Sequence, residues 1–176
     1  MEKVNAQLLK KVDSLPKNGE WLFELKHDGW RILAFVNSDV KLISRNDNDF
    51  TKKFADVTRT LRTWANGRSF VIDGEMLHDV YMVFDVLALD GKDLRGQTLL
   101  ERKKILEQLM KDAPSNIRLC QYVKSMTEQM LQTICQNGHE GVVAKLTNST
   151  YSAKRDGRWI KIKCQGYKRV NETNKS

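Results

Sequence analysis

Lysines stand at the ends of two short apolar segments of this chain, in places where a lysine could act on a substrate. The segment WLFELK ends at Lys26 and is followed by a histidine, an aspartate and a glycine, and the segment WIKIK carries Lys161 between two isoleucines and ends in Lys163. Successive side chains of a β-strand point to opposite faces. If these segments are strands, Lys26 shares a face with Leu22 and Glu24, opposite a strongly apolar face, and the other two lysines point together.

Carboxylates occupy comparable positions in two further apolar segments. Asp73 and Glu75 share one face of VIDGEM, while Glu140 opens EGVVAK, a segment that ends in Lys145. Charges on one face of a half-buried strand are often no more than its solvated side, and for any one segment this alternative stays open. Several strands that carry acids or lysines at their ends nevertheless offer the convergence that an active site needs.

Convergent cations and carboxylates suit phosphoryl or nucleotidyl transfer. Lysine and arginine neutralise phosphate oxygens, and one or two carboxylates hold Mg²⁺, which keeps waters and substrate phosphates as its other ligands. Arg31 and Arg45 add two cations close in sequence to the first lysine. A lysine that is crowded by cations and partly desolvated loses its proton more readily and becomes a nucleophile. On this hypothesis Lys26 is the attacking amine.

Other kinds of site have less support in the sequence. The chain has neither a GxxxxGK[ST] nor a GxGxxG stretch, so a phosphate would not be bound by either of these glycine-rich loops. His27, His78 and His139 are scattered along the chain, and no serine or cysteine lies in a recognisable nucleophile motif. We interpret these histidines as structural, and Trp30 and Trp159 as packing residues.

Many short strands and a few helices must position these side chains. Helical spacing of apolar residues predicts four helices, at about 1–13, 52–65, 98–113 and 127–136. Strand character is found in eight segments, 21–26, 30–36, 40–44, 69–77, 81–89, 117–123, 141–146 and 158–163. Several of these strands follow one another closely enough to pair in antiparallel fashion. The sequence therefore predicts an α+β fold dominated by strands.

Composition indicates one globular domain with an anionic partner. A chain of 176 residues can bury a core, and its formal net charge of +8 makes nucleic acid the leading candidate partner. Cys120, Cys135 and Cys164 form no CxxC pair, so we expect reduced thiols and neither a disulfide framework nor a zinc site. No stretch approaches membrane-spanning length, so we expect a cytoplasmic protein.

Six short motifs follow one another in a characteristic order along the chain. They are KHDGWR (26–31), SRN (44–46), IDGEM (72–76), MVFDVLALDG (82–91), EGVVAK (140–145) and WIKIK (159–163). This set resembles the motifs of covalent nucleotidyltransferases, the superfamily of DNA ligases, RNA ligases and mRNA capping enzymes. FDVLALDGKDLR, LLERKKIL and the closing WIKIKC look most like ATP-dependent DNA ligases of the bacterial end-joining type.

The resemblance implies a fold and a reaction. The fold would be two antiparallel β-sheets with flanking helices, an ATP-grasp-like nucleotidyltransferase fold. Lys26 would attack the α-phosphate of ATP, release pyrophosphate and hold AMP as a phosphoramidate. AMP would then pass to the 5′-phosphate of nicked double-stranded DNA, and a neighbouring 3′-hydroxyl would displace it to seal the nick.

The resemblance also implies roles for the matching residues. The nucleotide would be bound by Glu24, Arg31, Arg45, Glu75, Phe84 and Lys145. Among these, Glu75 would contact the ribose hydroxyls and Phe84 would stack on adenine, although Phe84 could also be plain core. Glu140 would help to place Mg²⁺, and Lys161 and Lys163 would bind the α-phosphate and stabilise its transition-state charge. Asp73 and Asp85 are as suited to orienting their neighbours as to touching metal.

The sequence stops soon after WIKIK, without room for the oligonucleotide-binding (OB-fold) domain of ligases. We therefore expect an adenylation domain at 1–164 and, at 165–176, a polar basic tail or the start of a missing OB-fold domain. A partner could supply that domain in trans. From the resemblance we further expect a bacterial, viral or phage protein that acts as a monomer and is associated with the nucleoid through DNA. An RNA ligase or a capping-type nucleotidyltransferase remains an alternative, as does a non-catalytic nucleic-acid-binding module, although a mere binder would not need these carboxylates.

Overall fold

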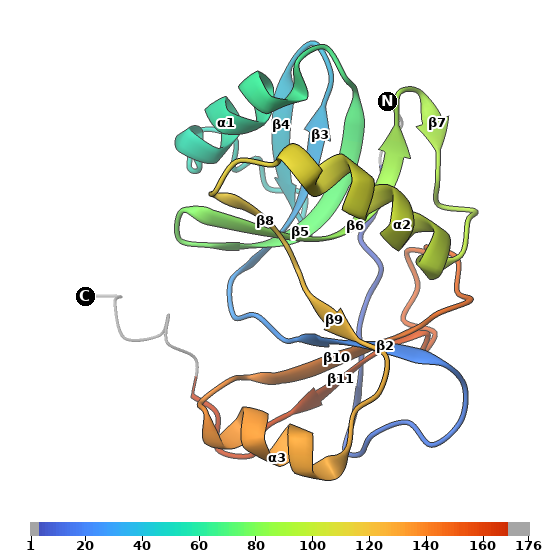
Figure 1. The fold of residues 1–176 in the computed structure, drawn as a ribbon. Coiled ribbons are helices and arrows are strands. Elements are labelled where there is room, and N and C mark those ends of the chain that lie inside the picture. The colour runs from blue at the N-terminus through green and yellow to red at the C-terminus, as the bar shows by residue number, and fades with distance from the viewer. Residues whose placement is uncertain (1–3, 169–176) are drawn as a thin grey trace.

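Two β-sheets form the body of the protein, with helices on their outer faces (Figure 1). The computed structural model describes residues 4–168. The strands are β1 (Lys10–Val12), β2 (Trp21–Leu25), β3 (Trp30–Val36), β4 (Val40–Ser44), β5 (Phe70–Leu77), β6 (Val80–Leu89), β7 (Lys92–Asp93), β8 (Ile117–Leu119), β9 (Tyr122–Val123), β10 (Gly141–Leu146) and β11 (Trp159–Lys163). The helices are α1 (Ala55–Ala65), α2 (Leu99–Leu109) and α3 (Glu128–Gln136), and a 3₁₀ turn at Met110–Asp112 follows α2.

The predicted α+β fold with two sheets is confirmed. One sheet has five strands in the order β1-β11-β10-β2-β9, and the other has six, in the order β4-β3-β5-β6-β7 with β8 against β6. Most neighbours are antiparallel, as predicted, but β1 pairs with β11 and β8 pairs with β6 in parallel. All eight predicted strand segments contain strands, and 117–123 is divided into β8 and β9.

The side chains between the sheets form one of three apolar clusters. Leu22 of β2 and Trp159 of β11 meet Leu33, Val71 and Phe84 of the six-stranded sheet in this cluster. Burial of apolar area between the two sheets is what holds them face to face. The cleft described below therefore lies beside a packed core.

Three helices cover the outer faces of the sheets. α1 and α2 pack on the six-stranded sheet through Val57, Leu61 and Leu106, and α3 packs under the five-stranded sheet through Leu131 and Ile134 (Figure 1). Within residues 4–168, no helix combines the length and the apolar character needed to cross a membrane.

The helix predicted for about 1–13 is wrong for the described residues from Val4 onward. They contain no helix, and Lys10–Val12 form β1, which pairs with β11 at the edge of the five-stranded sheet. The backbone N–H of Gln7 donates to the Tyr151 hydroxyl at 3.0 Å, and that of Leu8 donates to a loop carbonyl. Pairing with distant strands and loops outweighs the local helical spacing here, because helix propensity is only a weak preference.

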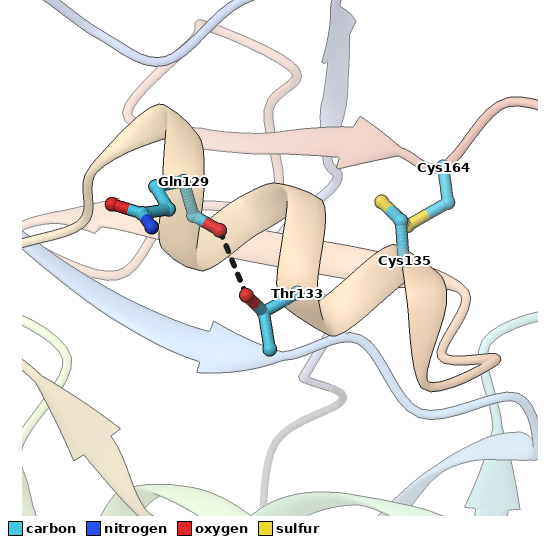
Figure 2. The surroundings of a disulfide bond; sticks show 4 residues. All are labelled: Gln129, Thr133, Cys135 and Cys164. Atoms are coloured by element: carbon cyan, nitrogen blue, oxygen red, sulfur yellow. Dashed lines mark hydrogen bonds between the residues drawn. A yellow bond between two sulfur atoms is a disulfide. The ribbon is translucent and has the colours of Figure 1, made fainter.

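A disulfide corrects the prediction of reduced thiols. Cys135, in the last turn of α3, is bonded to Cys164, which directly follows β11 (Figure 2). The two cysteines are 29 residues apart in sequence, and only the packing of α3 under the sheet brings them together. Spacing along the chain could not have revealed this pair. Cys120 is the free cysteine and is buried, as expected for a reduced thiol.

Reduction of the Cys135–Cys164 bond is expected to lower the free energy of unfolding by about 3 kcal/mol, because the unfolded chain gains the entropy of an open loop of 29 residues. The measurement is urea unfolding with and without a reductant. A C135S/C164S double variant is the control, and reductant should leave its midpoint unchanged. Equal midpoints for the wild-type protein under both conditions, together with free thiols at Cys135 and Cys164, would contradict the bond.

Candidate active site

Lys26 lies directly after the end of β2, next to the start of β10. Its backbone N–H donates to the carbonyl of Gly141 at 2.9 Å, and its Nζ donates to Oε2 of Glu140 at 2.6 Å. Gly141 has φ of +143°, and a Cβ at this position would lie 2.0 Å from the carbonyl oxygen of Ile162. Only glycine fits there. This close approach of β10 to β11 places Glu140 beside Lys26.

Glu140 is shared by two lysines. Its Oε1 forms an ion pair with Nζ of Lys163 at 2.8 Å, while Oε2 accepts a hydrogen bond from Lys26, and the Glu140 side chain is 6% exposed. Lys161 belongs to the same cation group. Burial lowers the pKa of Lys161 below its usual value, and the charges of Lys26 and Lys163 lower it further. The structure thus brings together lysines from the ends of β2 and β11 around one carboxylate.

Arg31 is held rigidly by Asp73. Its Nε and Nη2 donate to the two carboxylate oxygens at 2.6 and 2.7 Å, and the Tyr151 hydroxyl donates to the same carboxylate at 2.7 Å. Burial alone would lower the pKa of Arg31, but the charge and hydrogen bonds of Asp73 raise it above the usual value. Asp73 therefore orients its neighbours, and Arg31 remains a fixed cation.

Glu75 lies in β5, opposite Arg31 of β3 in the strand register. It accepts a hydrogen bond from the backbone N–H of Gly29 at 3.2 Å. A Cβ at Gly29 would lie 2.2 Å from the carbonyl oxygen of Met76, so glycine is required for this close approach. Burial raises the pKa of Glu75 above its usual value, more than the charges of Arg31 and Lys26 lower it.

A second ionic group lies deeper, around Glu24. Its Oε1 accepts from Lys103 at 2.5 Å and its Oε2 accepts from Lys145 at 2.7 Å, and all three side chains are at most 3% exposed. Burial raises the pKa of Glu24, but the two cations outweigh it, so the pKa lies below the usual value. The pKa of Lys145 is also lowered, first by burial and then by the charge of Lys103, because two cations share one carboxylate. Glu24 is therefore an anionic acceptor at neutral pH.

Phe84 of β6 stands beside this group. Its ring centroid is 4.0 Å from Nζ of Lys145, 4.7 Å from Cζ of Arg31 and 6.0 Å from the ring of Trp159. Phe84 belongs to the apolar cluster between the sheets and also lines a pocket. Trp159 is fully buried, as predicted for a packing residue.

These groups line two hollows that share part of their walls, an inner pocket and a more polar outer cleft. The inner pocket is lined by three of the predicted site residues, Glu24, Phe84 and Lys145. The outer cleft is lined by four others, Arg45, Glu140, Lys161 and Lys163. Both hollows are lined by Lys26, Arg31 and Glu75. The structure therefore brings every one of the predicted site residues to a single continuous surface. An aromatic ring and an anionic acceptor stand at its inner end, and lysines stand at its outer end.

Several residues of this surface escaped prediction. Trp30 is a correction, because it is 46% exposed on the cleft wall, with Nζ of Lys53 4.0 Å from its ring centroid, rather than packed in the core. Arg155 lines the cleft from the loop between β10 and β11. Lys103 lines neither hollow but contacts Glu24 of the inner pocket, and it could have been noticed as a charge on the apolar side of α2, between Leu99 and Leu106.

Comparison with known proteins places these motifs in a family. The model of the ATP dependent DNA ligase domain matches residues 3–80 and 77–163. The multifunctional non-homologous end joining protein LigD of Pseudomonas aeruginosa is 31% identical over 174 residues, which cover 85% of this chain and 21% of that protein. A DNA ligase of Thermoplasma volcanium is 29% identical, with 90% of this chain and 34% of that protein covered.

Solved structures agree with the sequence relatives. The ligase domain of M. tuberculosis LigD superposes with a TM-score of 0.76 at 26% identity, covering 90% of this chain and 60% of that one. A mycobacterial DNA ligase D complexed with ATP and MES gives a TM-score of 0.68 at 27% identity, covering 89% of this chain and 60% of that one. The chain spans about a fifth to a third of the length of the two sequence relatives named above. With the family model matched over nearly all of its length, this chain belongs to the ATP-dependent DNA ligase domain family.

Proposed function

We propose that this chain is the adenylation domain of an ATP-dependent DNA ligase, with Lys26 as the nucleophile. Nζ of Lys26 attacks the α-phosphorus of ATP, a P–N bond forms, and the bond from that phosphorus to the bridging oxygen of pyrophosphate breaks. Pyrophosphate leaves, and AMP stays on the lysine. The observation that carries the proposal is the 2.6 Å contact between Lys26 and Glu140 in a cleft lined by five of the six motifs, with Phe84 of the remaining motif in the adjoining inner pocket.

Charge at the reacting phosphate is neutralised by the lysines of β11. Lys161 and Lys163 lie on the strand next to β10, and Lys163 already shares Glu140 with the nucleophile. Cations placed where negative charge develops lower the barrier without any reorganisation at the moment of reaction. The proton of the Lys26 ammonium group must leave before attack, and Glu140 is the carboxylate that accepts its hydrogen bond.

The rest of the nucleotide occupies the inner pocket. Adenine stacks on Phe84, and its edge faces Glu24, which Lys145 holds from one side. Glu75 takes the ribose hydroxyls, since its carboxylate lines both hollows. Arg31 and Arg45 contact phosphate or the end of the nucleic acid, and the pairing of Arg31 with Asp73 keeps its guanidinium in one orientation.

Mg²⁺ fits the donor set of this site. Glu140 is the carboxylate next to the reacting lysine. Among the described residues, no three or more His, Cys, Asp or Glu side chains form a group that could hold a metal ion without other ligands. Mg²⁺ commonly takes one or two protein carboxylates together with substrate phosphates and waters. Glu140 would hold it, and the ion would supply neutralisation of phosphate charge.

Nicked double-stranded DNA is the substrate of the later steps. AMP passes from Lys26 to the 5′-phosphate, and the 3′-hydroxyl then displaces AMP to join the strands. Relatives named DNA ligase and the net charge of +8 support this assignment. We propose residues 1–164 as the adenylation domain, and an OB-fold domain, in the same chain or in trans, as the clamp on the far side of the duplex. The end of the predicted 165–176 segment lies outside the described residues.

Intact mass spectrometry tests the proposal. After incubation with ATP and Mg²⁺ the protein should carry one AMP per chain, and added pyrophosphate should remove it. GTP should give no adduct, whereas a GMP adduct would indicate a capping-type enzyme. A chain that binds DNA but forms no adduct with either nucleotide would be a binding module, and the proposal would be wrong. Transfer of the AMP to nicked DNA, rather than nicked RNA, separates the DNA ligase from an RNA ligase.

A further inference from the structure

Lys103 is a buried lysine that lies outside the six motifs and has no part in the chemistry described so far. It belongs to α2, and its side chain is 1% exposed. Its Nζ donates to Oε1 of Glu24 at 2.5 Å and to the backbone carbonyl of Phe84 at 2.8 Å. Glu24 belongs to β2 and Phe84 to β6, so one ammonium group ties the two sheets together at the inner pocket.

Other contacts also attach α2 to the sheet. The neighbouring Arg102 binds both carboxylate oxygens of Asp85 at 2.9 Å and also donates to the carbonyls of Gln97 and Ser149. Apolar side chains such as Leu106 anchor the same helix in the core. Burying an ammonium group costs free energy that an apolar residue of similar length would avoid. The ammonium group of Lys103 at this buried position therefore indicates a function in the pocket.

We propose that Lys103 is a positioning residue for the nucleobase. By binding the Glu24 carboxylate and the backbone of β6 at Phe84, it fixes the acceptor and the stacking ring relative to each other, so that adenine is accepted and guanine is rejected. This inference rests on the proposed function and deepens it, because it names what sets the nucleotide specificity of the same site.

The chemistry of the two purines supplies the discrimination. Adenine presents a 6-amino donor where guanine presents a carbonyl acceptor, and an ionised carboxylate can only accept. A carboxylate offers about four lone-pair sites. Lys103, Lys145 and the Cys120 thiol occupy Glu24 with three donors, which leaves acceptor capacity for an amino group. Without Lys103, Glu24 keeps partners on Oε2 alone and can turn, and the Phe84 carbonyl loses its charged donor.

The test is single-turnover adenylation of full-length variants with ATP and with GTP, in which KM is the nucleotide concentration that gives half the limiting rate and kcat is the limiting rate. Lys103→Met removes the ammonium group and keeps the chain length, and Lys104→Met, at the exposed neighbouring position of α2, is the matched control. Loss of a hydrogen bond to a charged group predicts an increase of about 10–100-fold in KM for ATP. We expect kcat to change little, and the preference for ATP over GTP to fall about tenfold.

A double-mutant cycle separates positioning from general damage. If Lys103 acts through Glu24, Lys103→Met should have little further effect on selectivity in a Glu24→Gln background. Should Lys103→Met fail to fold, Lys103→Gln retains a neutral donor and should show an intermediate loss of selectivity.

Two outcomes overturn this inference while the proposed function stands. In the first, the wild-type chain forms the adduct, but Lys103→Met and Lys104→Met have the same KM for ATP and the same preference for ATP over GTP. In the second, Lys103→Met causes its full loss of selectivity even in the Glu24→Gln background. A wild-type chain that forms no adduct would instead remove the proposed function, and this inference with it.

Discussion

Replacing Lys26 with alanine is expected to abolish the AMP adduct, with a loss of at least about 10⁴-fold in the adenylation rate. In the proposed mechanism phosphorus becomes bonded to the Lys26 nitrogen, so no neighbouring group is expected to substitute for it. Lys161 and Lys163 line the same cleft from β11, and the proposal assigns them to phosphate binding rather than to attack. The measurement is intact mass after incubation with ATP and Mg²⁺.

Lys26→Arg sharpens this prediction, because it keeps the positive charge beside Glu140 while offering a guanidinium that stays protonated and does not attack. It should bind ATP and form no adduct. Lys41→Ala, at an exposed position of β4, is the control and should adenylate at the wild-type rate. An adduct that persists in either Lys26 variant, mapped by peptide sequencing to another residue, would overturn the assignment of the nucleophile.

The strands and the side chains at their ends could be predicted because both depend on local pattern. Alternation in WLFELK and WIKIK reports which residues share a face, and the glycines beside Lys26 and Glu140 report close approaches of backbone. The meeting of Lys26 with Glu140, 114 residues away, is a different matter. Periodicity says nothing about which strand ends converge, so only the resemblance of the ordered motifs placed these two side chains in one site.

The misses all depend on tertiary contacts that no local pattern contains. β1 forms because an edge of β11 is available for pairing, against the helical spacing of the segment before it. Cys135 and Cys164 meet because α3 packs under the sheet. Trp30 has a large apolar side chain, as core residues do, but it lies at the open side of the cleft. Lys103 of α2 is buried because Glu24, in the five-stranded sheet, compensates its charge. In each case the partner lies far away in sequence.

Glu140→Ala is expected to slow adenylation by about 10²–10³-fold, and Lys163→Ala by a similar factor. Glu140 is the one acceptor that both Lys26 and Lys163 contact, at 2.6 and 2.8 Å, so its removal leaves two ammonium groups facing each other across the site. The orientation of the nucleophile and the place for Mg²⁺ would be lost together. Single-turnover adenylation at saturating ATP measures the effect on the chemical step.

Further variants distinguish charge from shape in this group. Glu140→Gln keeps the size and one acceptor oxygen but removes the charge, so a rate as low as that of Glu140→Ala would assign the effect to electrostatics. Glu128→Ala, in the exposed first turn of α3, is the matched control and should leave the rate unchanged. Because Glu140 and Lys163 form an ion pair, the double variant should lose less than the product of the two single losses. Wild-type rates in both single variants would mean that β10 and β11 do not border the reacting phosphate.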